Sequence, residues 1–203
     1  MKTKLLIAAG LALALNLPAA PQSFDFKDAK GVNNAVFKLD APLESINGTA
    51  SGISGTVNFD PENPEATTGR IVVEAKSLTV PNPVMKEHMH GAQWLDVEKY
   101  PEISFEAVKL ANVKRAGDNV TADVTGKFTL RGVTREITVP VRFTYLKDKL
   151  GARGGGKQGD LLVLRARFTI NRADFEVNPK APADKVAEEI EITLSVAGAA
   201  PKS

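Results

Sequence analysis

The sequence predicts an all-β protein, built as a closed eight-stranded antiparallel barrel with one short helix. Residues 121–130 and 137–145 alternate apolar and polar side chains with the two-residue period of a β-strand, and a short turn joins them. Segments with the same alternation recur along most of the chain. A sheet that is apolar on one face and polar on the other is typical of antiparallel strands. Eight such strands are enough to close a barrel.

The eight expected strands follow one another along the chain. The second changes its apolar parity beside Gly52, which predicts a β-bulge that bends it. The one helical pattern lies at residues 83–95, and Gly91 weakens it. The expected strands are residues 35–39, 46–59, 71–76, 103–107, 121–130, 137–145, 162–170 and 190–196.

Outward-facing charges offer a test of strand pairing. If the last two strands pair, Arg165 and Arg167 would face the outward Glu189 and Glu191. Opposite charges across neighbouring strands stabilise a sheet by about 0.2 to 1 kcal/mol per pair. We therefore expect arginine–glutamate pairs on this part of the outer surface.

Residues 1–20 have the layout of a secretory signal peptide. Two lysines precede an uncharged apolar run from Leu5 to Leu17, and small residues follow. The run is shorter than the roughly 20 apolar residues that span a bilayer. Pro21 disfavours cleavage directly after Ala20, so the cleavage site stays open, and a buried N-terminal helix is the alternative interpretation. We expect export, a single β-barrel domain at residues 24–197 and a flexible tail at residues 198–203.

Composition excludes several classes of protein. The chain has no cysteine, which excludes disulfides, a c-type haem link, cysteine-based zinc sites and lipid attachment through an N-terminal cysteine. Removal of residues 1–20 takes Lys2 and Lys4 from 26 basic residues and leaves 24 against 24 acidic ones, a formal net charge of zero. Nucleic-acid binding calls for a basic stripe, so we expect no nucleic-acid partner.

Two motif-like patterns carry no chemistry. Residues 151–159 match glycine-rich phosphate-binding patterns, but Gln158 stands where a P-loop needs Ser or Thr, and a strand is expected next instead of a helix. We expect a flexible hairpin loop there. His88 and His90, the only histidines, would lie about 200° apart on a helix, so we expect no metal site and a half-buried His88 beside Met89.

Catalysis has one open candidate. The chain has neither a cysteine nor a Gly-x-Ser-x-Gly elbow, so nucleophilic catalysis has little support. Asp96, Glu98 and Glu102 could approach carboxylates that are distant in sequence and form a hydrolase pair. The alternative interpretation, in which they cap and solvate the exit of the helix, also stays open at this point.

Large and small side chains share the inward parity. An eight-stranded barrel is about the size at which side chains fill the interior or leave room for one ligand, so both a solid core and a cavity stay open. The large inward residues are Phe59, Phe105, Phe128, Phe143 and Phe168, and the small ones are Gly48, Ala50, Gly55, Ala75, Ala107, Gly126 and Ala166.

Residues 46–61, 87–105 and 126–141 resemble the YceI family of polyisoprenoid-binding, lipocalin-like proteins. The segments YPEISF at residues 100–105 and LRGVT at residues 130–134 are the most specific. The segment NRADF at residues 171–175 is similar to the family's Arg-x-Asp-Phe motif, so the resemblance covers nearly the whole expected mature chain.

The resemblance implies an extended, lipocalin-like, usually periplasmic barrel that holds a polyprenyl lipid or isoprenoid quinone in an internal tunnel. It implies no cofactor and no catalytic residues. Three positions depart from the family pattern. Asn33-Asn34 lies where members often have His-Ser, Ala50 stands where an aromatic residue is common, and Glu176 replaces the glycine that usually follows Asp-Phe. Loss of an aromatic side chain would widen the cavity locally.

We therefore expect a periplasmic carrier of one long-chain amphiphile, without enzymatic activity, with peripheral or no membrane contact, and with homodimer formation left open. A structural or interaction module of the cell envelope with a filled barrel is the alternative, and an enzyme acting on a lipid comes third. Met85, Met89 and Trp94 would form adaptable walls near one end. The expected ligand-contact residues are Phe59, Val73, Met85, Met89, Trp94, Phe105, Val124, Phe128, Val141, Phe143, Leu164 and Phe168.

Overall fold

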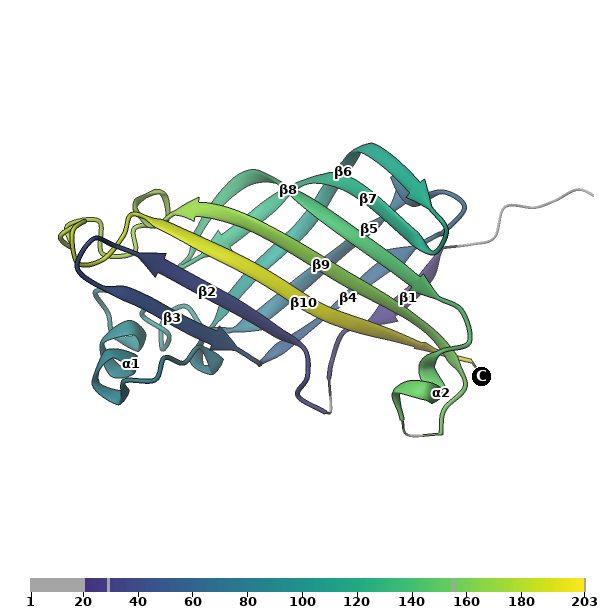
Figure 1. Ribbon diagram of the computed structural model, residues 1–203, viewed down its shortest axis with the longest axis horizontal. Helices are drawn as coiled ribbons and strands as arrows, with labels where there is room; N and C mark the ends of the chain where they lie inside the picture. The colour runs from purple at the N-terminus through teal and green to yellow at the C-terminus, as the bar shows by residue number, and fades with distance from the viewer. Residues whose placement is uncertain (1–20, 29, 155, 203) are drawn as a thin grey trace, which may run out of the picture.

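The computed structural model describes residues 21–28, 30–154 and 156–202, so the expected signal peptide at residues 1–20 lies outside the described part of the chain (Figure 1). The strands are β1 (Gln22–Asp25), β2 (Asn34–Asp40), β3 (Ser45–Ala50), β4 (Ile53–Phe59), β5 (Thr68–Glu74), β6 (Glu102–Ala116), β7 (Asn119–Leu130), β8 (Val133–Leu146), β9 (Gly159–Asn171) and β10 (Glu189–Pro201). The α-helices are α1 (Pro83–His90) and the single turn α2 (Leu150–Arg153), and the 3-10 turns are Pro64–Ala66, Ala75–Ser77 and Arg172–Phe175.

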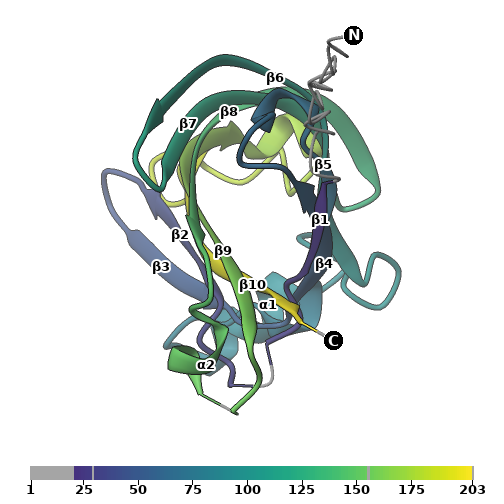
Figure 2. The same ribbon diagram turned by 90° about the vertical axis from the view of Figure 1, so that its right-hand side faces the viewer.

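Eight of these strands form a closed antiparallel ring in the order β1, β4, β5, β6, β7, β8, β9, β10. The ring closes where β1 pairs with β10, at Asp25 and Ala199. Figure 2 looks along the barrel from the end that carries α2 and shows the strands arranged around its axis. The expected eight-stranded antiparallel barrel is confirmed.

The two remaining strands form a hairpin on the same last strand. β2 pairs with β10 from Asn34 opposite Ser195 to Lys38 opposite Glu191, and β3 pairs with the far side of β2. β1 and β2 thus occupy successive stretches of one edge of β10. In Figure 1 the β2–β3 hairpin lies near α1, at the end of the barrel away from α2.

The expected strand at residues 46–59 proves to be two strands, β3 and β4, and the predicted bulge is a break at Ser51 and Gly52. The Gly52 carbonyl accepts a hydrogen bond from the Glu74 N–H at 2.7 Å, which redirects the chain from the hairpin into the ring. A Cβ on Gly52 would lie 2.8 Å from the Cβ of Glu74, so this crossing leaves no room for a side chain.

Both ends of the described chain are more ordered than expected. β1 was not predicted, because a four-residue strand that buries only Phe24 shows too little alternation. The predicted flexible tail is wrong over residues 198–201, which form the end of β10 opposite β9. Gly198 lies against the ring of Phe26, where a Cβ would come within 2.6 Å of a ring carbon, so the small residues of this segment allow the close packing.

The helix is shorter than predicted, since α1 ends at His90. The N–H of Gly91 caps it by donating to the carbonyls of Glu87 at 3.1 Å and His88 at 3.0 Å. Asn82 caps the other end, where its side-chain oxygen accepts hydrogen bonds from the N–H groups of Val84 and Met85. Within the described residues, no helix is long and apolar enough to cross a membrane.

The β7–β8 hairpin follows the predicted alternation. Its register runs from Asn119 opposite Thr144 to Leu130 opposite Val133. Arg131 and Gly132 form the two-residue turn with φ values of 51° and 74°, the left-handed conformations that match the twist of a hairpin. A Cβ on Gly132 would lie 2.4 Å from a ring carbon of Tyr100, which packs directly against the turn.

We predict that Gly132→Ala destabilises the protein more than Gly117→Ala. Both glycines have positive φ, but nothing lies within 4 Å of a Cβ on Gly117. Because both residues have positive φ, the backbone strain is similar in the two variants, at about 1 to 2 kcal/mol. In Gly132→Ala the clash with Tyr100 adds at least about 1 kcal/mol. Urea unfolding measures the difference, and equal losses in the two variants would contradict the assigned packing.

Candidate functional site

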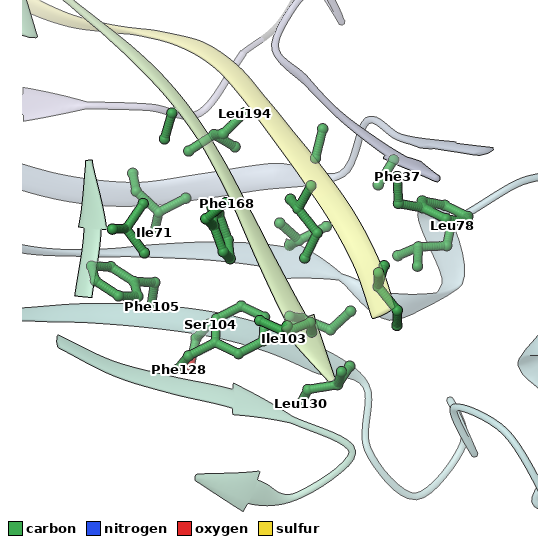
Figure 3. Close-up of a pocket in the computed structure, with 18 of the residues that line it drawn as sticks. Phe37, Ile71, Leu78, Ile103, Ser104, Phe105, Phe128, Leu130, Phe168 and Leu194 are labelled. Carbon is green, nitrogen blue, oxygen red and sulfur yellow. The ribbon is translucent and has the colours of Figure 1, made fainter. Parts of the chain in front are cut away.

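The barrel encloses an apolar cavity of about 390 Å³. Aliphatic, aromatic and methionine side chains from the strands, α1 and the neighbouring loops form its wall. Figure 3 shows Ile71, Phe105, Phe128, Phe168 and Leu194 arranged around this space. The volume lies within the range of about 300 to 1,000 Å³ that is typical of small-molecule sites. The interior is thus not a completely packed core.

The expected ligand-contact residues meet in this cavity with one exception. The inward direction of the strand residues follows from the strand alternation, whereas Met85, Met89 and Trp94 reach the cavity from α1 and the turn after it. Contact of all of them with a ligand stays a prediction. The residues on the wall are Val73, Met85, Met89, Trp94, Phe105, Val124, Phe128, Val141, Phe143, Leu164 and Phe168.

Phe59 is the exception and lies beyond the deep end of the cavity. It is fully buried and stacks on Phe143, with ring centroids 5.6 Å apart. Phe24, also fully buried, meets Tyr145 edge to face at 6.3 Å. These rings pack against one another at the α2 end, so the inward Phe59 closes the barrel instead of lining the cavity.

Several other residues of the cavity wall were not among the expected ligand-contact residues. Phe37 and Leu194 carry the strand alternation and could have been included. Other wall residues lie outside the strands and show no two-residue period, so parity could not identify them. These are Leu78, Val80, Leu95, Val177 and Val186.

The cavity reaches solvent near α1. Among the wall residues that the structure describes, only Glu44 and His88 are exposed, one beside the tip of the β2–β3 hairpin and the other on α1. The prediction of a half-buried His88 is wrong. His90 is the partly buried histidine, and its Nε2 lies 2.8 Å from the Leu78 carbonyl oxygen. This contact ties the end of α1 to the segment that precedes the helix, while His88 stays at the rim.

Arg172 holds the loop that completes the rim. Its side chain is buried at 1% exposure, and no carboxylate among the described residues forms an ion pair with it. Every guanidinium nitrogen instead donates to backbone carbonyls of the β9–β10 loop, which satisfies the buried cation. The acceptors are the carbonyl oxygens of Val177, Asn178, Ala181, Val186 and Ala187.

Arg131 anchors the neighbouring turn to the segment after α1. Its Nη2 donates to the Ala92 carbonyl at 2.9 Å, and its guanidinium lies 5.9 Å from the ring centroid of Tyr100. The β7–β8 turn is therefore fastened to the chain that follows the helix. Sequence reasoning assigned roles to neither arginine, although both lie in the motifs that carried the family resemblance.

The carboxylates left open as catalytic candidates lie off the cavity wall. Glu98 forms an ion pair with Lys76 at 2.9 Å, and Glu102 forms one with Arg70 at 3.2 Å. The described residues contain no group of three or more His, Asp or Glu side chains arranged to hold a metal ion. The geometry of the cavity therefore supports binding of an apolar molecule.

A polar network locks the closed end. Asp28 accepts hydrogen bonds from the N–H groups of Val32 and Asn33, both at 2.6 Å, and lies 3.4 Å from Arg153 of α2. Burial alone would raise the pKa of Asp28, but the backbone hydrogen bonds and the Arg153 charge outweigh it and hold this pKa below its usual value. The Asn33 side chain donates to the carbonyls of Phe26 and Ala197.

A model of the YceI-like domain matches residues 27–197. The chain belongs to the YceI family. Protein YceI of Salmonella arizonae is 31% identical over 156 residues, which are 74% of this chain and 72% of that protein. UPF0312 protein VPA0850 of Vibrio parahaemolyticus is 32% identical over 171 residues, covering 82% of this chain and 88% of that protein.

Solved structures share the barrel of this YceI protein. Burkholderia cenocepacia BcnA superposes with a TM-score of 0.65 at 21% identity, over 81% of this chain and 95% of that one. A polyisoprenoid-binding domain from Saccharophagus degradans, implicated in plant cell wall breakdown, gives 0.63 at 12% identity, over 89% and 99% of the two chains. At these identities the likeness shows a common fold.

The structure shows where the three departures from the YceI pattern lie. Ala50 is buried on the cavity wall, so a small side chain there leaves volume that an aromatic ring would fill. Glu176 adopts the left-handed conformation, with φ 56°, that the usual glycine accepts without strain. Its carboxylate lies 3.7 Å from Arg131. Asn33 belongs to the lock at the closed end.

We predict that Arg172→Lys loosens the rim of the YceI barrel. Lysine keeps the charge but cannot reach five carbonyls with a planar fork, so some of the loop carbonyls lose their partners. Amide hydrogen exchange should accelerate at residues 177–187 and stay unchanged in the β7–β8 hairpin. Arg167→Lys, in an exposed ion pair, is the matched control and should change little. Unchanged exchange at residues 177–187 would contradict the role of Arg172.

We predict that Asp28→Asn destabilises the protein at pH 7 by about 1 to 3 kcal/mol and by less at pH about 3, below the unfolded pKa. The pKa of Asp28 is lower in the folded than in the unfolded chain, so its carboxylate stabilises the fold above the unfolded pKa of about 3.9. That contribution disappears as the pH falls through the folded pKa. Urea unfolding at both pH values measures the change, and an equal loss at both would refute the assignment.

Proposed function

We propose that this protein is an exported carrier that binds one long-chain apolar amphiphile, such as a polyisoprenoid lipid or an isoprenoid quinone, inside the barrel. The observation that carries the proposal is the apolar cavity, which is closed by aromatic packing at one end and bordered by exposed residues at the other. Binding is non-covalent and requires no cofactor.

The amphiphile enters the barrel with its hydrocarbon tail first. The deep end of the cavity is lined by Val124, Val141 and Phe143, which offer apolar contacts to a hydrocarbon tail. The hydroxyl of Thr67, also on the wall, donates to the Pro64 carbonyl and is thereby satisfied. The polar head group lies at the rim, near Glu44 and His88, where water can solvate it. Met85 and Met89, one helical turn apart on α1, adapt their side chains to the part of the lipid that passes them.

Removal of the apolar chain from water drives the binding. Apolar surface contributes roughly 25 cal/mol per Å², so a few hundred Å² supplies several kcal/mol before the costs of association and ordering. The polyisoprenoid-binding domain of Saccharophagus degradans, with the same fold, supports this choice of cargo. The signal-peptide pattern at residues 1–20 supports export to the periplasm.

Native mass spectrometry combined with organic extraction tests the proposal on protein purified from its own periplasm. A stoichiometric polyprenyl or quinone species is the expected result. Protein that is empty and also fails to take up added isoprenoids would overturn it, and would favour an interaction module of the cell envelope. Turnover of the extracted lipid by the protein would instead favour an enzyme.

We predict that Val124→Phe weakens binding of a quinone with eight isoprene units by about tenfold or more. The larger side chain occupies the deep end and displaces the equivalent of about two methylene groups, at about 0.8 kcal/mol each. A quinone with two isoprene units should bind almost unchanged. Trp94 lies on the wall and is the only tryptophan, so quenching of its fluorescence reports both affinities.

Val108→Phe is the matched control for this prediction, because Val108 on β6 is 56% exposed. It should affect neither quinone. Equal weakening of both quinones by Val124→Phe would contradict a tail that reaches the deep end.

A further inference from the structure

A row of basic side chains crosses the outer wall of the barrel. Strand register places Lys114 on β6 opposite Thr121, Thr121 opposite Arg142, Arg142 opposite Arg165, and Arg165 opposite Ser195. The residues on either side of each arginine line the cavity, so the arginines themselves face outward. The two guanidinium groups therefore extend from directly opposed positions on β8 and β9.

Like charges directly opposite one another destabilise a sheet. Among the described residues, no carboxylate lies within ion-pair distance of Arg142 or Arg165. The guanidinium of Arg165 donates to the carbonyls of Leu164 at 3.1 Å and Val196 at 3.3 Å. Burial and the charge of Arg142 together lower the pKa of Arg165. Arg165 thus faces Ser195 on β10, where a glutamate was expected, and a second cation on β8.

The neighbouring carboxylates are already engaged. Asp123 accepts a hydrogen bond from the Asn112 amide at 2.7 Å, and Glu191 pairs with Arg167 at 2.6 Å. This part of the outer surface therefore has a net charge of +2. Its basic groups are Lys114, Arg142, Arg165 and Arg167, and its acidic groups are Asp123 and Glu191. The opposed arginines remain without a counter-charge.

These side chains border a groove on the outside of the barrel. The pairing of β6 with β7 shifts between Ala111 and Lys114, and this irregular strand forms one side of the groove. The floor is a single sheet, since Val141, Ala166 and Leu194 border both the groove and the cavity. An occupant of the groove would therefore lie directly behind the wall that contacts the cargo.

We propose that this groove binds an extended acidic segment of a partner protein. From Lys114 on β6 to Arg165 on β9 the row crosses three strand spacings, about 14 Å. An extended chain with an acidic residue at every second position presents carboxylates about 7 Å apart, so three successive carboxylates cover this span. Arginine binds carboxylates through two parallel hydrogen bonds. A flat membrane surface cannot follow a groove, whereas an extended chain can.

The probe for this proposal is a rhodamine-labelled ten-residue peptide of alternating Glu and Thr, titrated with the full chain and followed by fluorescence anisotropy. The double variant Arg142→Gln/Arg165→Gln should bind at least about tenfold more weakly than the natural protein. The control Lys180→Gln/Lys185→Gln removes the same charge from exposed positions of the β9–β10 loop and should bind within about twofold. Equal weakening in both variants would overturn the proposal, because net charge alone would then explain binding.

Two further measurements distinguish an acidic peptide from other anionic ligands of the groove. Displacement of the peptide by millimolar inorganic phosphate as effectively as by unlabelled peptide would overturn the proposal in favour of a small oxyanion. Sedimentation with phosphatidylglycerol vesicles that depends on the arginines, without peptide binding, would overturn it in favour of a membrane.

Stability provides an independent readout. Arg142→Gln removes a like-charge contact, so its urea midpoint should equal or exceed that of the natural protein while peptide affinity falls. A clearly lower midpoint would show that the arginine supports the fold, and would overturn its assignment to a binding surface.

Discussion

Alternation of side chains in a sheet that closes on itself determines the architecture of this protein. Successive residues of a strand point to opposite faces, and closure removes one of these faces from bulk water. At the α2 end the enclosed space is filled by rings such as Phe24, Phe26 and Phe59, all fully buried. Towards α1 small wall residues such as Ala35 and Ala50 leave it unfilled. The position of the cavity follows from where bulky and small inward residues fall along the barrel axis.

Polar contacts at the two ends determine which end is open. Around the closed end, Asp28 and Asn33 connect the segment after β1 to α2 and β10, and the Asn33 side chain donates to the Phe26 carbonyl. Burial and the hydrogen bond to Asp160 raise the pKa of Tyr145 to about 12, so this phenol stays a neutral donor at the same end. Around the open end, the rim is a helix and a loop, held by the contact of His90 with Leu78 and by the hydrogen bonds of the Arg172 guanidinium. Loops and helix termini move more readily than paired strands, so this is the natural route for a ligand.

Most of the strands, and the face to which their side chains point, could be predicted from the sequence, because a two-residue period is a local property. Parity alone was enough to direct Phe128 and Phe143 inward. Depth along the barrel axis depends on strand register and stagger, which are not local, and for that reason Phe59 was assigned to the cavity although it closes the barrel. The four-residue β1 and the end of β10 carry too little alternation to be recognised without their partners. The facing pair Arg142 and Arg165 likewise appears only once β8 is known to pair with β9.

A crystal structure of the protein, purified from its own periplasm without removal of lipid, would show whether the barrel holds a long apolar chain. We predict continuous, elongated electron density inside the barrel, running from the rim beside His88 to Val124 and stopping before Phe59. A barrel without such density, in which Phe128 and Phe168 have turned to fill the space, would contradict it.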